Sequence, residues 1–227
     1  MDQNEMKKAV AAAAAKYVEE RLDENSVIGV GTGSTANCFI ECLAPFKNRI
    51  LSTVASSEET RRRLMALGIP VFDLNSVDEV TFYIDGADEA NAQLHLIKGG
   101  GGALTREKII AAVAKEFVCI ADESKLVPVL GKFPLPVEVI PMATRRVIQQ
   151  FAAMGGTGTV RLKDGKPLVT DNGQYILDVH GLKLTEPMAL EARISQWPGV
   201  VTVGIFAFQK ADICLLATPD GVQTLRY

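Results

Sequence analysis

Residues 26–36 read SVIGVGTGSTA, a β-branched run that passes through a glycine-rich turn into the polar start of a helix. β-branched residues favour a strand, and the closely spaced glycines permit a tight backbone turn. Ser34 and Thr35 are residue types that cap a helix at its N-terminus. The stretch therefore predicts a strand, a turn and a helix in succession, which is the repeating unit of α/β proteins.

Strands and helices alternate on both sides of this unit as far as residue 121. Helices are predicted over about 4–22, 34–46, 57–67 and 104–115, and strands over 26–30, 50–55, 70–72, 80–84 and 117–121. Strands separated by helices of about a dozen residues are typical of βαβ units. We expect an α/β fold with a mainly parallel sheet and helices on both of its faces.

The pattern changes after Lys132, where the sequence FPLP interrupts the alternation. Hairpin turn chemistry follows in KDGK at 163–166 and in DNG at 171–173. This part predicts a smaller α+β domain with helices over 143–154 and 186–196, strands between 157 and 180, and apolar strands over 200–206 and 213–217. The last strand is expected to return to the first sheet, so 1–131 with 203–227 form the main domain and 132–202 an inserted one.

Composition excludes several classes of protein. The chain has 227 residues, 48% of them hydrophobic, and a net charge of −3, so no bulk positive charge favours nucleic acid. The longest apolar run, 200–208, is too short to cross a membrane, and the alanine-rich segment after Lys7 is interpreted as an amphipathic helix. Four cysteines without CxxC spacing indicate a reducing, cytoplasmic setting.

Two further clusters favour ordinary structural explanations. Arg61, Arg62 and Arg63 follow two glutamates, and such a run is usually the solvated face of a helix. Cys38 and Cys42 lie four residues apart, but only two histidines are available to complete a metal site. We expect no metal and no other cofactor.

The turn at 31–35 is a candidate phosphate site, because amide N–H groups at a helix start favour an anion. It fails the dinucleotide pattern GxGxxG, since Ser34 occupies the third glycine position, and it lacks the lysine of a P-loop. A glycine turn alone is equally compatible with a purely structural role.

Two more segments carry candidate chemistry at the same edge of the predicted sheet. IDGADE at 84–89 places Asp85 and Asp88 at the end of a buried strand, where a carboxylate can act in proton transfer or satisfy a local turn. KGGGGALTREK at 98–108 combines Lys98, four glycines and Glu107, which is either a base or a favoured first-turn residue of a helix. Together the three segments indicate a small anionic, polyhydroxylated ligand.

The motifs in this order resemble the type A ribose-5-phosphate isomerases along essentially the whole chain. The resemblance rests on VGTGST at 30–35, DGADE at 85–89, KGGG at 98–101, ALTREK at 103–108, IADESK at 120–125, GKFPLPVEV at 131–139 and TDNG at 170–173. Gly102 departs from the alanine common in the family. The resemblance implies a Rossmann-like main domain, no cofactor, and a homodimer, with a tetramer as the alternative.

The resemblance also implies roles for individual residues. Glu107 matches the proton acceptor, Lys98 is implied to stabilise the oxyanion, and Asp85 or Asp88 to open the sugar ring. The implied substrate contacts are Lys7, Thr32, Gly33, Ser34, Thr35, Asp85, Gly86, Ala87, Asp88, Lys98, Gly99, Gly100, Gly101 and Lys125. The expected reaction is the interconversion of ribose 5-phosphate and ribulose 5-phosphate through an enediolate, without a metal.

Two other functions fit the same segments. One is an amino-sugar-phosphate deaminase on a similar scaffold, which would release ammonia from glucosamine 6-phosphate. The other is a sugar-phosphate sensor domain of a transcription regulator, which would be joined to a basic helix-turn-helix, and the sequence contains none.

Overall fold

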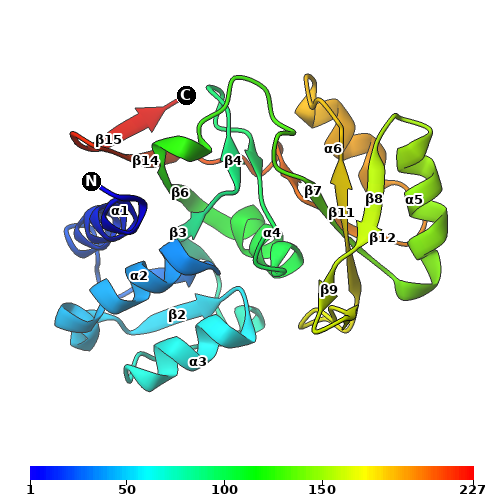
Figure 1. Cartoon of the computed structure of the whole chain (residues 1–227). Helices are drawn as coiled ribbons and strands as arrows, with labels where there is room; N and C mark the ends of the chain where they lie inside the picture. Colours follow the sequence, from blue (N-terminus) through cyan, green and yellow to red (C-terminus); the bar gives the residue numbers. More distant parts are fainter. The chain divides into compact units, whose positions relative to one another are not determined.

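A six-stranded sheet forms the centre of the α/β part of the chain. The computed structural model describes all 227 residues and gives the strand order β15-β14-β6-β3-β1-β2. All neighbours are parallel except the pair of β14 and β15. The strands are β1 (Val27–Val30), β2 (Ser52–Ala55), β3 (Val80–Gly86), β6 (Ala114–Asp122), β14 (Ile213–Thr218) and β15 (Gly221–Arg226). The expected mainly parallel sheet is confirmed (Figure 1).

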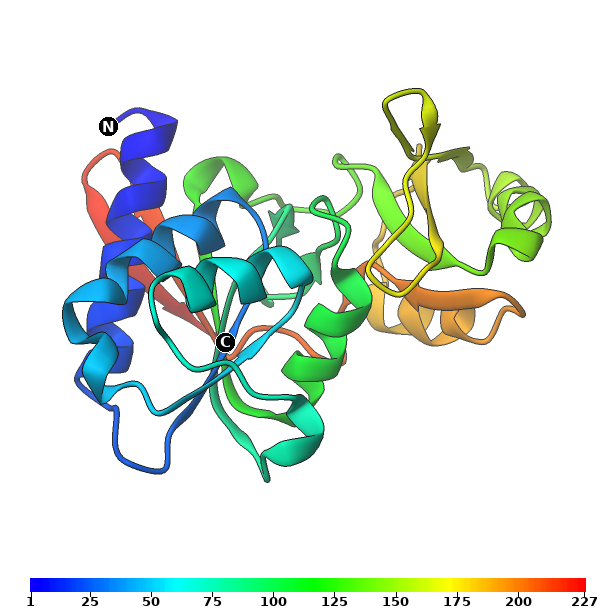
Figure 2. The same cartoon turned by 90° about the horizontal axis from the view of Figure 1, so that it is seen from below.

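Helices cover both faces of this sheet, as expected (Figure 2). Side chains of α1 (Gln3–Glu19), α2 (Ser34–Cys42) and α3 (Glu58–Ala66) share one hydrophobic core with the sheet. On the other face lies α4 (Leu104–Val113), whose Ile110 packs so closely on β1 that only glycine fits at Gly29. The loops at the carboxyl ends of β1 and β3 are thereby held in place from both sides.

The chain divides into two compact units. The first comprises Met1–Ala87, Arg106–Lys125 and Ala211–Tyr227, and the second Asp88–Thr105 and Leu126–Lys210. These bounds differ from the predicted domain limits mainly because 88–105 packs with the second unit. The division into 1–131 with 203–227 and an insertion at 132–202 stays a prediction of domain organisation.

The second unit is built on antiparallel sheets. A four-stranded sheet has the order β12-β7-β11-β8, and a three-stranded sheet has the order β13-β5-β4. The elements are β4 (Glu89–Ala90), β5 (Leu96–Ile97), β7 (Leu135–Val139), α5 (Thr144–Ala152), β8 (Thr157–Val160), β11 (Tyr175–His180), α6 (Pro187–Ser195), β12 (Val200–Val203) and β13 (Ile205–Phe206). Phe151 on α5 and Trp197 pack edge to face at 4.9 Å within its core.

The hairpin predicted at 163–166 is present as β9 (Leu162–Lys163) and β10 (Lys166–Pro167). Its turn residues Asp164 and Gly165 both have positive φ, as a two-residue hairpin turn requires.

Two predicted elements are shorter in the structure than expected. The helix predicted over 34–46 ends at Cys42, because Pro45 cannot continue it and a 3-10 helix, Ala44–Arg49, follows. The strand expected at 70–72 is reduced to one bridge between Val71 and Thr53. None of the helices combines the length and hydrophobicity that crossing a bilayer requires.

Candidate active site

The glycine turn at 31–35 connects β1 to α2, as predicted. Its start is fixed by a hydrogen bond of 2.9 Å from the Gly31 N–H to the carbonyl oxygen of Ile84 on β3. The Thr32 hydroxyl lies 2.7 Å from the Ser56 hydroxyl and donates to that of Ser57 at 2.8 Å. Gly33 has φ +117°, which favours glycine, and Ser34 begins the helix. The turn thus presents the N-terminus of α2 in a fixed shape.

Asp85 at the end of β3 is joined directly to this turn. Its side chain is 0% exposed, and Oδ1 accepts hydrogen bonds from the backbone N–H of Thr32 at 3.2 Å and of Gly86 at 2.7 Å. Oδ2 accepts from the Tyr83 hydroxyl at 2.5 Å. Two of the predicted segments, 31–35 and 85–87, therefore meet at one carboxylate.

Gly31 has no space for a side chain, because the Asp85 carboxylate occupies it. A Cβ at Gly31 would lie 1.9 Å from Asp85 Oδ1, far closer than atoms that are not bonded approach each other. The glycine is required here by close packing, since its φ is not in the left-handed region.

Glu107 lies in the first turn of α4 and is 2% exposed. Burial, followed by the nearby charges of Asp85 and Glu107, raises the pKa of the Tyr83 hydroxyl well above its ordinary value. Tyr83 therefore stays neutral, and its hydroxyl donates a hydrogen bond to Asp85. The charges of Asp85 and Glu107 thus both act on the same tyrosine of the first unit.

The second unit carries the other predicted segment. Asp88 is half-buried, and its Oδ2 accepts a hydrogen bond from the Gly100 N–H at 2.8 Å. The buried ammonium of Lys98 lies 5.5 Å from the ring centre of Phe206. Within the second unit, Asp88 thus contacts the glycine loop directly.

Arg161 also binds the glycine loop. Its guanidinium binds the Asp178 carboxylate through two hydrogen bonds of 2.9 and 2.6 Å. It also donates to the carbonyl oxygens of Gly99 at 2.9 Å and Gly100 at 3.1 Å. The planar guanidinium suits this arrangement, because it directs several donors at fixed angles.

The remaining predicted residues lie in the first unit, apart from Gly101, which is exposed in the glycine loop of the second. Gly86 and Ala87 are half-buried at and just beyond the end of β3, and Thr35 lies close to Gly86. Lys7 on α1 and Lys125 at the end of a 3-10 helix, Glu123–Lys125, are both half-buried. No group of three or more histidine, cysteine, aspartate or glutamate side chains is arranged to hold a metal ion.

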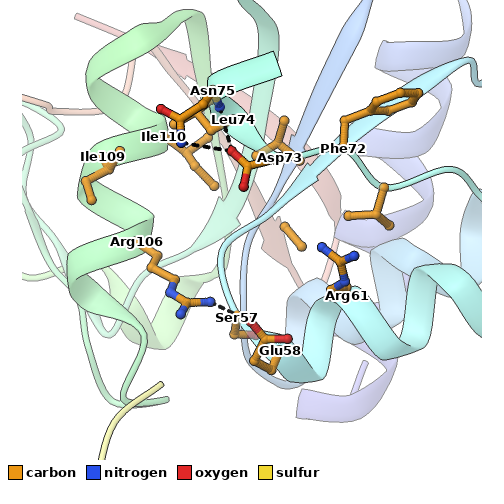
Figure 3. A pocket seen from close by; sticks show the side chains of 13 residues that line it. Ser57, Glu58, Arg61, Phe72, Asp73, Leu74, Asn75, Arg106, Ile109 and Ile110 are labelled. Carbon is orange, nitrogen blue, oxygen red and sulfur yellow. Dashed lines mark hydrogen bonds and ion pairs between the residues drawn. The ribbon is translucent and has the colours of Figure 1, made fainter. Parts of the chain in front are cut away.

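The first unit also contains a pocket of about 460 Å³ (Figure 3). Its wall includes Ser57, the partner of Thr32, and Arg106, which precedes Glu107 and is paired with Glu58 at 2.8 Å. Arg62 and Arg63 pair with Glu59 on a solvated helix face, as predicted, whereas Arg61 lines the pocket.

Comparison with known proteins identifies the family. Residues 52–221 match the family model "Ribose 5-phosphate isomerase A (phosphoriboisomerase A)". The ribose-5-phosphate isomerase A of Polaromonas sp. strain JS666 is 61% identical, over 99% of this chain and 94% of that protein. The chain belongs to the ribose 5-phosphate isomerase A family.

Solved members of the isomerase family share the whole fold. The ribose 5-phosphate isomerase A of Neisseria gonorrhoeae is 44% identical with a TM-score of 0.93, over 99% of this chain and 97% of that one. A D-ribose-5-phosphate isomerase in complex with phospho-erythronic acid is 37% identical with a TM-score of 0.94, over the full length of both chains. The match decides against a deaminase or a sensor domain as the family of this chain.

Sequence reasoning missed two residues that hold the isomerase segments in place, Tyr83 and Arg161. Tyr83 is two residues before Asp85 on a strand, so both side chains point to the same face, and this spacing was a usable signal. Arg161 is 62 residues from Gly99 and 61 from Gly100, and nothing in its local sequence indicates that contact.

Proposed function

We propose that this chain interconverts ribose 5-phosphate and ribulose 5-phosphate by moving a proton between C2 and C1, with Glu107 as the base. The isomerase reaction follows from family membership and belongs to the pentose phosphate pathway. The observation that supports the base is a nearly fully buried carboxylate in the first turn of α4, in the motif shared with the family. A base in such a site is shielded from water, which favours proton transfer to and from carbon.

The steps balance without an added oxidant or reductant. Glu107 takes the proton from C2 of the open-chain aldose, and the electrons move onto O1 to form an enediolate. Glu107 then returns the proton to C1 while the O2 hydroxyl loses its proton and becomes the ketone oxygen. Lys98 and the N–H groups of Gly99 and Gly101 stabilise the negative oxygen, because their positive charge and dipoles are fixed in advance.

The phosphate binds at the start of α2, on the turn formed by Gly33, Ser34 and Thr35. Free N–H groups and the helix dipole favour an anion at that position. Lys7 and Lys125 add positive charge to the same end of the ligand. Thr32, Gly86 and Ala87 border the sugar.

Asp88 opens the sugar ring, and Asp85 has a different task. The half-buried Asp88 carboxylate has access to a sugar hydroxyl, whereas Asp85 is fully buried and both of its oxygens accept hydrogen bonds from the protein. Proton transfer between O1 and O2 is assigned to Asp88 as well.

The first experiment measures conversion of ribose 5-phosphate by the wild type and by Glu107→Gln, both after EDTA treatment. The variant is expected to lose about 100-fold to 10 000-fold in kcat, the range typical of losing a general base. Glu59→Gln is the matched control, because Glu59 is a half-exposed first-turn glutamate of α3 that pairs with Arg62 and Arg63 on the solvated helix face. If Glu107→Gln kept more than a few per cent of the activity, another group would be the base.

A second experiment separates ring opening from proton transfer. Ribulose 5-phosphate cannot form a five-membered ring, because its O5 carries the phosphate, so exchange of its C1 hydrogen with D2O needs no ring opening. Asp88→Asn is expected to slow conversion of ribose 5-phosphate at least tenfold more than it slows this exchange. Equal losses in both reactions would remove the ring-opening assignment.

The complex of a relative with phospho-erythronic acid suggests a ligand for the same site here. Such an acid carries negative charge beside a hydroxyl-bearing carbon, as the enediolate does, and mimics of an intermediate bind tightly. We expect it to inhibit this chain competitively with ribose 5-phosphate. The homodimer and the cytoplasmic setting stay predictions, and light scattering of the purified protein distinguishes a dimer from a tetramer.

A further inference from the structure

Tyr83 is a buried polar residue that the proposed chemistry does not use. It lies in the middle of β3, and its ring packs on that of Phe117 with the centroids 4.9 Å apart. A phenylalanine would fill the same volume without the cost of burying a hydroxyl group. The hydroxyl must therefore be satisfied locally, and its recorded acceptor is Asp85 Oδ2 at 2.5 Å.

Asp85, the acceptor of this hydrogen bond, also contacts the turn that begins with Gly31. The oxygen that does not bind Tyr83 accepts the N–H of Thr32, and the Cβ position of Gly31 is filled by the same carboxylate. The turn is also held by the Thr60 hydroxyl, which donates to the Gly31 carbonyl oxygen at 2.7 Å. Of these contacts, only the one through Asp85 ties the turn to β3 by a charged group.

The direction of the hydrogen bond is fixed. Burial and the neighbouring negative charges raise the pKa of Tyr83, so the phenol keeps its proton and donates throughout the working range of pH. An ionised carboxylate only accepts, and a donor at each of its oxygens sets its rotation about the Cβ–Cγ bond. Without the phenol, Oδ2 of Asp85 would lose the Tyr83 hydrogen bond, whereas Oδ1 would keep its backbone donors.

We propose that Tyr83 is a positioning residue of the isomerase, whose hydroxyl orients the Asp85 carboxylate and through it the turn at 31–35. The inference rests on the proposed function for the role of that turn in binding phosphate. Tyr83 itself contacts neither the substrate nor the reacting carbons. Its effect reaches the reaction through the shape of the turn.

The test compares Tyr83→Phe, Asp85→Ala and the double variant in steady-state kinetics. A hydrogen bond to a charged group corresponds to about a tenfold to hundredfold change, so Tyr83→Phe is expected to lower kcat/KM by that factor, mainly through KM. Asp85→Ala should lose more, because it also removes the contacts to Thr32 and Gly86. Tyr83 also has a hydrogen bond with Ser56, but the proposal assigns its effect to Asp85, so the double variant should lie within about twofold of Asp85→Ala.

Tyr17→Phe is the matched control. Its hydroxyl also donates to a carboxylate of the first unit, Glu116 at 2.8 Å, but this hydrogen bond joins α1 to β6 and does not involve the turn at 31–35. That variant should keep kcat and KM of the wild type. A melting curve of each variant shows whether it is folded at the assay temperature.

Two kinetic results would overturn the proposal. One is a Tyr83→Phe enzyme within twofold of the wild type, and the other is a double variant whose loss equals the product of the two single losses. Calorimetric titration with inorganic phosphate tests the role of Tyr83 independently of the proposed function. Tyr83→Phe and Asp85→Ala are expected to bind phosphate more weakly than the wild type, even if the wild type does not isomerise ribose 5-phosphate. Unchanged phosphate binding in both variants would also overturn it.

Discussion

Asp85 in the first unit and Glu138 in the second are both 0% exposed and both accept several hydrogen bonds, yet we assign them opposite tasks. Glu138 lies within β7, in the interior of the four-stranded sheet, and accepts from the hydroxyl groups of Thr105 and Thr170 and the amide of Asn172. Asp85 lies at the carboxyl end of a parallel strand and accepts from backbone N–H groups of loops.

The difference shows that burial and satisfied hydrogen bonds do not identify a functional carboxylate by themselves. What distinguishes Asp85 is its place, because ligands bind at the carboxyl edge of a parallel sheet. Apart from the Tyr83 hydroxyl, its partners are backbone N–H groups of turns that we assign to the substrate, whereas those of Glu138 are side chains of a polar cluster within the second unit. Four experiments test whether the two carboxylates, and the units that contain them, differ in this way.

The largest effect is expected from Gly31→Ala. The new methyl group would lie 1.9 Å from Asp85 Oδ1, so the carboxylate must move and release Thr32. Displacing a binding loop by about 1 Å can cost 100-fold, and we expect kcat/KM to fall at least that far. Overpacking should also lower the free energy of unfolding by about 1–3 kcal/mol.

The stability control for this change is Gly86→Ala. Its Cβ would lie 3.6 Å from the nearest atom, which is ordinary contact, so the melting temperature should stay close to that of the wild type. A Gly31→Ala enzyme with wild-type kinetics would mean that Asp85 does not need its observed position.

Glu138→Ala should have the reverse signature. Removing the carboxylate leaves hydroxyl groups and an amide without their acceptor in a buried site, which costs about 3 kcal/mol in the free energy of unfolding. We expect kcat/KM to change by less than about threefold at temperatures where the variant is folded. Chemical unfolding in urea measures the first quantity and the isomerase assay the second.

Glu186→Ala is the matched control in the second unit, because Glu186 is exposed and its side chain makes no capping hydrogen bond. Its stability should lie within about 0.5 kcal/mol of the wild type. A large loss of activity in folded Glu138→Ala would place Glu138 with the functional carboxylates and erase the contrast with Asp85.

Arg161→Lys tests whether the glycine loop of the second unit is held as firmly as the turn of the first. Lysine can pair with Asp178, but it cannot also direct two donors at the carbonyl oxygens of Gly99 and Gly100. Losing those bonds should raise KM about three- to tenfold, in line with ordinary hydrogen bonds. Arg145→Lys on the exposed face of α5 should leave KM unchanged.

Much of this comparison was predictable from the sequence, and the rest depends on contacts between distant segments. The βαβ alternation and the turn chemistry around Asp164 are local, so they predicted the sheet and the hairpin correctly. β7 was missed because Pro136 argues against an interior strand, although it stands near the start of that strand where its missing N–H is tolerated.

The candidate site divides in the same way. Asp85, Asp88 and Glu107 were predicted as site residues because each belongs to a glycine-containing motif at the end of a strand or the start of a helix. Glu138 and Arg161 have partners 32 to 62 residues away, which no local pattern encodes. Tyr83 lies between these cases, since strand periodicity places it beside Asp85 but does not reveal that its hydroxyl is a donor.

The smallest expected effect concerns the pH dependence of stability, and it arises from a histidine of the second unit. His95 lies in the second unit, and burial, followed by the charge of Lys210, lowers its pKa below 6.5, while Glu191 opposes the shift. The unfolded chain therefore binds this proton more readily, so the stability that His95 contributes is present above about pH 6.5 and is lost as the pH falls below it. Because the side chain is only partly buried, solvent screening keeps the effect small.

His95→Gln should consequently reduce the loss of melting temperature between pH 7.5 and pH 5 by about 1 °C. His180→Gln is the control, because it removes the exposed histidine of the same unit and should leave the loss unchanged. If His95→Gln enlarged the loss on acidification, the histidine would be stabilised in its charged form by Glu191. In that case His95 would protect the second unit against acid, and the desolvation of its side chain would not set this unit apart from the first.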